Sequence, residues 1–381
     1  MLTATVSELR CPQKIQKIKG KPTCFGHLDL HSRKQVKLDV ITGELVCQKC
    51  KTQYPILGGV AILLSDVAAY LVHHVKGISQ LVPDSEIPKK YLRDYLFAKA
   101  EIEEGHIEDD LEAARVISLY FMNHYLTVKA ASNEWWKAEN GPSSPLIAKL
   151  IQEYWDHGPF EQIQVWLEKL NQNNQLPNAR VLELGCGVGG LYSVLKSGIG
   201  SYLGLDQSFA SIALARHLHL GAPYPGKIMI PQDLLAGVTS REMGAKISLA
   251  QNQSVDWIVS DFAHPPLEFE GYDICIALNL IDMLDHPHEL PKMQSEVLKK
   301  GGIAIQSSPY IWNERAAKQL RSHQPASVKT SAKAVEHLYT KAGFRISDSE
   351  EHIPWLFFKN LRQLEVYSVH AFMAVKGDRV Q

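Results

Sequence analysis

The sequence predicts an α/β protein built on a parallel sheet, with a small cysteine-bearing unit before it and a helical region between the two. Short apolar runs between residues 179 and 305 end in glycines or acidic residues, as buried parallel strands do before they turn into helices. Four of the six cysteines lie within the first 50 residues. Residues 67–175 carry apolar side chains at helical spacing, interrupted by prolines.

Length and charge narrow the classes of protein that the chain can belong to. Its 381 residues suffice for one large domain and a smaller one. The 40 basic and 41 acidic residues nearly balance, so the overall basic field of a general nucleic-acid binder is missing. The sequence has no apolar stretch of about 18 residues and no apolar core of a secretory signal. We therefore expect a cytoplasmic protein that does not contact a membrane.

Residues 1–66 form the first predicted domain, and its cysteines predict a metal site. A C-x-x-C turn places two thiolates on one loop, and two more from another loop would complete a tetrahedral zinc site. So short a unit buries little apolar surface, so a metal would supply folding free energy. Cysteines clustered in this way, rather than spread as a disulfide framework, suggest a reducing compartment. The expected ligands are Cys11, Cys24, Cys47 and Cys50.

This domain resembles the zinc-ribbon activator subunits of tRNA and protein methyltransferases. The shared pattern is L-x-C-P, then L-x-C-x-x-C, Y-P-I and a G-V-x-x-L-L tail. In that family the first two cysteines usually lie a few residues apart, whereas here a lysine-rich insertion separates Cys11 from Cys24. His27 is therefore a spare candidate ligand, with a surface histidine as the simpler interpretation. A ribbon that has lost its metal is the alternative to structural zinc.

Residues 67–175 are predicted to form a helical linker that caps the substrate. This is the aromatic-rich part of the chain. Two interpretations remain open: the aromatic side chains pack a helical layer onto the sheet, or some of them roof an active site. His124 and Tyr125 are candidates for the second role.

The third domain, residues 176–381, opens on the strand and loop A-R-V-L-E-L-G-C-G-V-G-G. Glycines at these positions let the backbone approach a ligand, and the helix that follows offers free N–H groups. The next strand ends about 20 residues later in Asp206, where a carboxylate can accept both hydroxyls of a ribose. A later strand ends in Asp261 and another in Asn279.

The ordered motifs E-L-G-C-G-x-G-G, G-L-D, D-F, Y-D-I…L-N-L and L-K-K-G-G-I resemble those of class I S-adenosylmethionine-dependent methyltransferases. The resemblance implies a Rossmann-like sheet of seven strands that ends in an antiparallel hairpin. Nicotinamide dehydrogenases, the alternative, usually open on G-x-G-x-x-G. We interpret the Cys186 thiol itself as a packing group. The implied cofactor-binding residues are Glu183, Gly185, Cys186, Gly187, Gly189, Asp206, Gln207, Asp261, Phe262 and Asn279.

Asn279 and Asp282 follow the fourth strand of the third domain, beside the expected position of the methyl group. Three residues apart, they would share one face of a short helix and point into the pocket. A purely structural role is the alternative, because aspartate often caps a helix at this place.

The motif N-L-I-D resembles that of imidazole N-methyltransferases, namely the ovothiol-pathway mercaptohistidine enzymes, carnosine methyltransferase and protein-histidine methyltransferases. The S-P-Y-x-W at residues 308–312 resembles the ovothiol type. An imidazole must present one nitrogen lone pair to the methyl group, and a carboxylate on its N–H sets that tautomer. The resemblance implies that Asp282 holds the N–H and Asn279 orients the ring. Tyr310 and Tyr367 would add contacts.

The sequence therefore predicts an S-adenosylmethionine-dependent N-methyltransferase with structural zinc. Its acceptor would be a small histidine derivative or a histidine-containing peptide or protein. A methyltransferase that acts on RNA or a translation protein is one alternative, since the ribbon is activator-like, although the balanced charge disfavours nucleic acid. A non-catalytic module that binds the cofactor or activates a partner is another. The excursion at residues 222–253 receives no function.

Overall fold

In a computed structural model of the chain, the described residues are 1–13, 24–103, 108–125, 144–172, 176, 178–195, 198–222, 228–231, 238–241, 255–360 and 362–377. Two features predicted from the sequence lie largely outside these ranges. They are the lysine-rich insertion between Cys11 and Cys24, and most of the excursion at residues 222–253.

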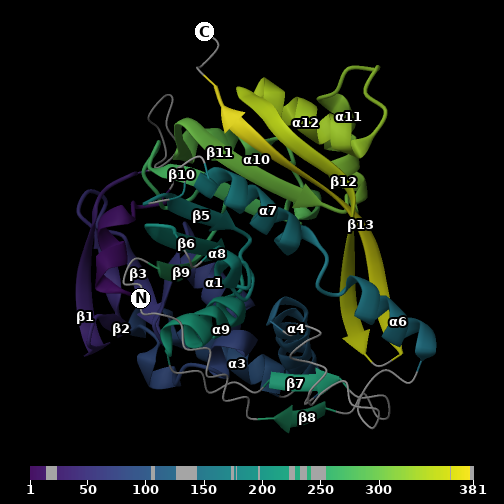
Figure 1. The fold of residues 1–381 in the computed structure, drawn as a ribbon. Coiled ribbons are helices and arrows are strands. Elements are labelled where there is room, and N and C mark those ends of the chain that lie inside the picture. The colour runs from purple at the N-terminus through teal and green to yellow at the C-terminus, as the bar shows by residue number, and fades with distance from the viewer. Residues whose placement is uncertain are drawn as a thin grey trace.

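The N-terminal unit is an antiparallel meander that begins with a short 3₁₀ helix (Figure 1). Its strands pair in chain order, and the first of them is exposed along most of its length whereas the last two are almost wholly buried. Two-residue turns join the first strand to the second and the third to the fourth, and Gly58 and Gly59 of the last turn have positive φ angles. The elements are η1 (Thr3–Glu8), β1 (Leu28–Val36), β2 (Asp39–Cys47), β3 (Gln53–Leu57) and β4 (Val60–Leu63).

The main sheet has eleven strands rather than the expected seven, in the order β1-β2-β3-β4-β9-β6-β5-β10-β11-β13-β12. The seven from β9 onwards form the parallel sheet with a terminal antiparallel hairpin that the sequence predicts. The other four belong to the N-terminal unit. The bounds are β5 (Arg180–Leu184), β6 (Ser201–Asp206), β9 (Val255–Ser260), β10 (Tyr272–Leu278), β11 (Leu298–Ser308), β12 (Phe344–Asn360) and β13 (Gln363–Lys376).

Strand β4 joins the N-terminal unit to the rest of the sheet. It pairs in parallel with β9, where Ile62 lies opposite Val259. Every residue of both strands is buried. An apolar strand left at the edge of a sheet would expose unpaired backbone groups, and β4 covers that edge of β9. This pairing is why the expected count of seven strands is too small.

A buried charge network reinforces the same junction. The Asp256 carboxylate on β9 accepts hydrogen bonds from the Leu2 N–H (2.8 Å) and the Thr5 hydroxyl (2.9 Å) at the N-terminus. It also pairs with Arg216, which in turn contacts Asp39 on β2. Arg216 and Asp256 are both shielded from solvent, so removing either partner would leave an uncompensated buried charge. The N-terminal unit is therefore held to the sheet by charges as well as by strand pairing.

Helices pack on the sheet and fill the segment between the N-terminal unit and β5. Helix α9 contacts β6 and β9, while α10 and α12 contact the strands at the hairpin end. Among the described residues, no helix is both long and apolar enough to cross a membrane. The helices are α1 (Val67–His73), α2 (Val75–Ser79), η2 (Asp84–Glu86), α3 (Lys89–Glu103), α4 (Glu108–Tyr125), α6 (Pro145–Tyr154), α7 (Pro159–Gln172), α8 (Tyr192–Leu195), α9 (Phe209–Leu220), η3 (Ile281–Met283), α10 (Glu289–Val297), α11 (Glu314–Ser322) and α12 (Ser331–Lys341). A separate small ribbon consists of β7 (Ile228–Pro231) and β8 (Val238–Arg241).

The hairpin of β12 and β13 is longer than the sheet that it completes. Strand β11 pairs only with the residues of β13 from His370 to Val375, so the other half of the hairpin extends past the sheet beside α6 (Figure 1). Helix α4 is fastened to that half by Asn123. Its amide accepts from the Phe358 N–H (2.7 Å) and donates to the Phe358 carbonyl (3.0 Å). The hairpin and α4 therefore form one connected layer.

Candidate active site

The glycine loop follows β5 and closes on the end of β6. Gly185 and Gly189 have φ angles of +68° and +76°, in the left-handed region that favours glycine. A Cβ atom on Gly189 would lie 2.9 Å from the Trp257 indole nitrogen and from the Ala215 side chain. The Gly187 N–H donates to the Asp206 carboxylate at 2.9 Å. The loop thus packs tightly against Trp257 and Ala215, and a hydrogen bond connects it to Asp206 at the end of the next strand.

Asp206 is the acidic residue that the sequence assigns to the ribose hydroxyls. Its second oxygen accepts the Ser208 N–H at 2.7 Å, so both oxygens are oriented by backbone groups. Each retains capacity for a further hydrogen bond, as a bidentate ribose contact requires. Burial raises the pKa of Asp206, while its backbone donors oppose that shift. The neighbouring Gln207 has an exposed side chain, and its carbonyl accepts from the Tyr70 hydroxyl at 2.6 Å.

Asp261 and Phe262 follow β9, which lies next to β6 in the sheet. The two acidic residues are therefore at the same edge, since parallel strands end together. The Asp261 carboxylate accepts the Ala263 N–H at 3.0 Å and lies 3.5 Å from the His264 ring. Phe262 is half-buried against the core. The structure thus places the pair that the sequence analysis assigns to the adenine at the same sheet edge as Asp206.

Glu183 lies in β5, two residues before the loop, with its side chain buried between strands. It accepts a hydrogen bond from the Tyr202 hydroxyl on β6. Burial raises the pKa of Glu183 to about 8. Cys186 is also buried, close to Gly204, and burial raises the pKa of its thiol, which keeps it protonated and unreactive. The contact that the structure gives Glu183 is thus Tyr202.

The raised pKa of Glu183 predicts a pH dependence of stability. Folded protein keeps a proton that the unfolded chain releases above pH about 4.5, so the folding free energy is most favourable below that pH and declines towards pH about 8. Glu183→Gln keeps an acceptor for Tyr202 but cannot titrate. We expect the Tm of the variant to fall less than that of the wild type between pH 5 and 8. Thermal melts across this range measure it, and parallel curves for the two proteins would contradict it.

Asn279 follows β10 in a left-handed conformation, with φ at +50°. Its N–H donates to the Ser307 carbonyl (2.8 Å), and its side-chain oxygen accepts from the Ser307 hydroxyl (3.1 Å). Asn279 therefore precedes the short helix η3 rather than sharing a face of it with Asp282, as the spacing had suggested. Both residues remain at the carboxyl end of β10, one strand from the glycine loop.

Asp282 lies within η3 and is only 3% exposed. One carboxylate oxygen accepts the Ile311 N–H at 2.8 Å, from the loop after β11. The other oxygen is buried and has no hydrogen-bond partner among the residues that the structure describes. The residue that precedes η3 is Leu280, and no side chain caps that helix. The bond to Ile311 means that Asp282 does not act as the helix cap.

Tyr310 and Tyr367 flank this carboxylate from two further elements. The Tyr310 hydroxyl lies 2.6 Å from Nδ1 of His370 on β13, and its ring stacks on Trp312 at 5.5 Å. The Tyr367 hydroxyl donates to Glu365. Burial is the largest cause of the raised pKa of both tyrosines. The charges of Glu351 and Glu336 come next for Tyr310, and Glu365 comes next for Tyr367, with Asp282 the smallest contribution in each case. His370 was not singled out from the sequence, because only the strand register brings it to Tyr310.

A series of aromatic side chains in contact runs from helix α4 to Tyr367 on the hairpin. Tyr120 on α4 contacts Phe357 at 5.7 Å between ring centroids. Phe357 contacts Trp355 (5.7 Å), and Trp355 contacts Tyr367 (5.0 Å). On the same helix, His124 lies against Gly190, where an added Cβ would approach the histidine Cβ to 2.6 Å. Burial lowers the pKa of His124 to about 4, so its ring is neutral at pH 7. Helix α4 therefore contacts the glycine loop through His124 and reaches Tyr367 on the hairpin through a series of ring contacts.

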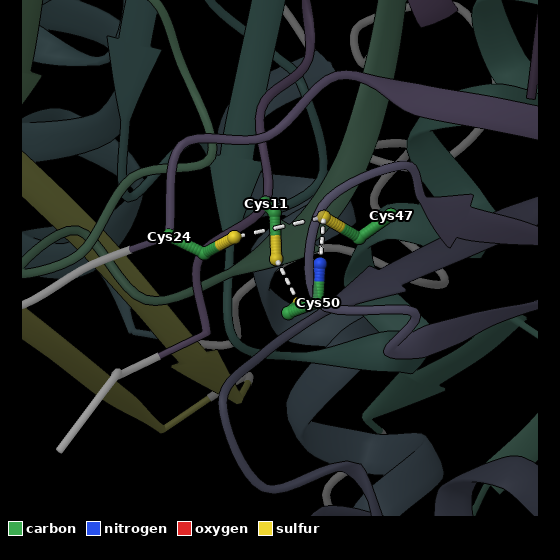
Figure 2. Close-up of side chains that lie close together, drawn as sticks. All are labelled: Cys11, Cys24, Cys47 and Cys50. Atoms are coloured by element: carbon green, nitrogen blue, oxygen red, sulfur yellow. Dashed lines mark hydrogen bonds between the residues drawn. The ribbon is translucent and has the colours of Figure 1, made fainter.

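The four predicted metal ligands come together in the N-terminal unit (Figure 2). All four sulfurs lie within 4.8 Å of one another, with Cys11–Cys50 at 3.5 Å and Cys24–Cys47 at 3.7 Å. A tetrahedron with Zn–S bonds of about 2.3 Å has S–S edges of about 3.8 Å, so these two separations are close to a tetrahedral edge and the cluster is compatible with zinc. His27 is exposed and takes no part in it.

The model of a protein family described as a methyltransferase domain matches residues 154–349, slightly more than half of the chain. The chain belongs to this methyltransferase family. Together with the strand order, the match makes it an S-adenosylmethionine-dependent methyltransferase of the class I fold, as the motifs predicted. Helix α4 and the N-terminal unit lie outside the matched residues.

Three solved structures show limited likeness to the methyltransferase. Magnesium protoporphyrin IX methyltransferase of Synechocystis PCC 6803 with bound SAH is 15% identical and covers 69% of this chain and 100% of its own, with a TM-score of 0.39. A complex of the Haloferax volcanii Trm112 methyltransferase activator with a methyltransferase is 14% identical and covers 58% and 97%, with a TM-score of 0.36. The YcgJ protein of Bacillus subtilis is 11% identical and covers 56% and 98%, with a TM-score of 0.36. A search of curated protein sequences finds no match.

Proposed function

We propose that this methyltransferase transfers the methyl group of S-adenosylmethionine to an imidazole nitrogen of a histidine derivative or a histidine side chain. The observation that supports this proposal is the Asp282 carboxylate. A buried acceptor without a donor carries a free-energy penalty, which a ligand that brings an N–H group would remove. An imidazole N–H is a donor of the right kind.

The geometry around Asp282 suits the orientation of a neutral imidazole. The Ile311 N–H fixes one carboxylate oxygen, so the other has a defined direction. An imidazole that donates its N–H to this oxygen has its second nitrogen unprotonated, and that lone pair is the nucleophile. Because Ser307 already donates to the side-chain oxygen of Asn279, the amide NH₂ group of Asn279 remains as a donor. It would orient the acceptor through an oxygen beside the ring, such as a carboxylate or a carbonyl, since the ring lone pair must face the methyl group.

The protein's contribution to the transfer is mainly orientation. When bound, S-adenosylmethionine supplies an electrophilic methyl group, and the reaction needs an in-line nucleophile rather than a covalent intermediate. The glycine loop and Asp206 would hold the donor, and Asp282 and Asn279 the acceptor. Methylation leaves a positive charge on the ring, and the aromatic series from Tyr120 to Tyr367 offers ring faces that stabilise a cation.

We also propose that residues 1–66 form a structural zinc ribbon. Its four sulfurs have the spacing of a tetrahedral site, and burial raises the pKa of the Cys11 and Cys24 thiols, so a cation is needed to stabilise their thiolates. The Cys50 N–H donates to the Cys47 sulfur at 3.4 Å, the type of backbone contact that supports a thiolate in a C-x-x-C loop.

The acceptor is tested with methyl-labelled S-adenosylmethionine and the full-length protein. The panel consists of histidine, mercaptohistidine, carnosine and histidine-containing peptides, with the same peptides carrying asparagine in place of histidine as controls. We expect label on an imidazole nitrogen, located by fragmentation mass spectrometry, with at least one member of the panel. Label only on other atoms, or only on added RNA, would refute the imidazole proposal.

A further inference from the structure

Two side chains from different helices form hydrogen bonds to carbonyl groups of the glycine loop, those of Val188 and Gly189. The Tyr125 hydroxyl, at the end of α4, donates to the Val188 carbonyl at 2.7 Å. Nε2 of His219, on α9, lies 2.9 Å from the Gly189 carbonyl. The same nitrogen is 2.6 Å from the Tyr125 hydroxyl, so the two side chains and two carbonyls form one network.

The surroundings of His219 leave it little freedom to move. Its ring lies parallel to that of Trp257 at 4.8 Å, and Tyr192 contacts it edge-on at 5.1 Å. The Trp257 indole also lies against Gly189, where any added Cβ would collide with it. His219 is 5% exposed and Val188 is fully buried. The network is therefore rigid, and its partners are protein groups rather than solvent.

Holding these carbonyls also orients the amide groups of the loop. A peptide group is planar and trans, so fixing a carbonyl oxygen directs the N–H of the next residue to the opposite side. The Gly189 carbonyl points to His219, and hence the Gly190 N–H points away from it. The Gly189 N–H, which follows the Val188 carbonyl, donates to the Cys186 carbonyl at 2.9 Å and so fixes the turn of the loop. In a loop that binds its ligand through backbone amides, the direction of the Gly190 N–H then determines whether that amide faces the ligand.

We propose that Tyr125 and His219 are positioning residues for S-adenosylmethionine, acting through the carbonyls of Val188 and Gly189. They do not touch the cofactor in this assignment. Tyr125 lies outside the residues that match the methyltransferase family, so cofactor affinity in this protein depends on a helix that its family match does not include.

The last turn of α4 connects this network to the hairpin of β12 and β13. Asn123 bonds the hairpin at Phe358, His124 lies against Gly190, and Tyr125 holds Val188. Three consecutive residues thus contact the hairpin and the cofactor loop. A loss of the Tyr125 bond should loosen the loop without removing any group that binds the acceptor.

The test compares Tyr125→Phe, His219→Leu and His219→Gln in the full-length protein. Binding of S-adenosylhomocysteine is measured by calorimetry, and Tm by thermal melts. We expect Tyr125→Phe to raise Kd about fivefold to tenfold, as the loss of one hydrogen bond predicts. His219→Leu should raise Kd at least as much. His219→Gln, which keeps an N–H donor, should recover part of the affinity.

Tyr339→Phe is the matched control, because it removes another buried hydroxyl, bonded to Gln294 and remote from the loop. It should lower Tm while leaving Kd unchanged. In steady-state assays, Tyr125→Phe should raise KM for S-adenosylmethionine and leave KM for the acceptor unchanged. Kd values within twofold of the wild type for both Tyr125→Phe and His219→Leu, with Tm lowered as in the control, would overturn the proposal. The binding arm requires no knowledge of the acceptor, so it is independent of the imidazole assignment.

Discussion

Replacing Asp282 by asparagine is expected to lower kcat by about 10²- to 10⁴-fold, the range that removal of one orienting or proton-accepting group produces. An asparagine oxygen can still accept the Ile311 N–H. Its NH₂ group would then occupy the position of the unpartnered oxygen. An NH₂ group is a donor, so it would repel the N–H of an imidazole instead of accepting a hydrogen bond from it. Steady-state rates with the acceptor identified by the labelling panel provide the measurement.

The Kd of S-adenosylhomocysteine should remain at its wild-type value in Asp282→Asn, because Asp282 lies on the acceptor side of the site. Asp285→Asn is a suitable control. Asp285 is three residues away, is exposed, and pairs only weakly with Arg315 at the surface. It should retain full turnover. A kcat for Asp282→Asn within tenfold of the wild type would remove Asp282 from the mechanism.

Replacing Cys47 by serine is expected to release the proposed zinc ion and to lower Tm by more than about 10 °C. Structural zinc contributes about 10 kcal/mol or more to folding in small zinc domains. Each kcal/mol moves Tm by about 2–4 °C in chains of about 150–250 residues and by less in a longer chain such as this one. Cys47 ends β2, and the meander that it anchors leads through β4 into the main sheet. Loss of the metal should therefore destabilise the main sheet as well as the N-terminal unit. Metal analysis and calorimetry measure the two effects.

Cys275→Ser provides the control for this substitution, since Cys275 is a buried thiol in β10, far from the cluster in sequence and in the sheet. It should retain one zinc per chain. A wild-type protein purified with zinc under reducing conditions that contains no metal, and whose Tm does not respond to a chelator, would show that the ribbon folds without it.

The strands of the catalytic sheet were predictable because buried parallel strands have a recognisable local sequence pattern. Runs such as Val181–Leu184, which is apolar except for Glu183, are buried on both faces and stop at a glycine or an acidic residue. The cysteine cluster was predictable for a different reason. Thiolates are specific ligands, so residue type identified them despite the long insertion after Cys11.

What the sequence did not predict depends on contacts between distant segments. Nothing local in Ile62 indicates that it pairs with Val259, so the expected sheet stopped at seven strands. The left-handed backbone of Asn279 depends on its bonds to Ser307, and a helical spacing rule cannot anticipate it. Glu183 was assigned to the cofactor from its place before the loop, but its hydroxyl partner Tyr202 is provided by the neighbouring strand.

The pairing of β4 with β9 has a consequence for how the protein behaves on dilution. A separate subunit that covers the edge of a sheet dissociates when its concentration falls below its Kd, whereas a tethered segment keeps an effective concentration set by the chain itself. The N-terminal unit is covalently continuous with the sheet that it extends. The edge of β9 is therefore covered at any protein concentration, and each catalytic domain has its own copy of the unit that covers it.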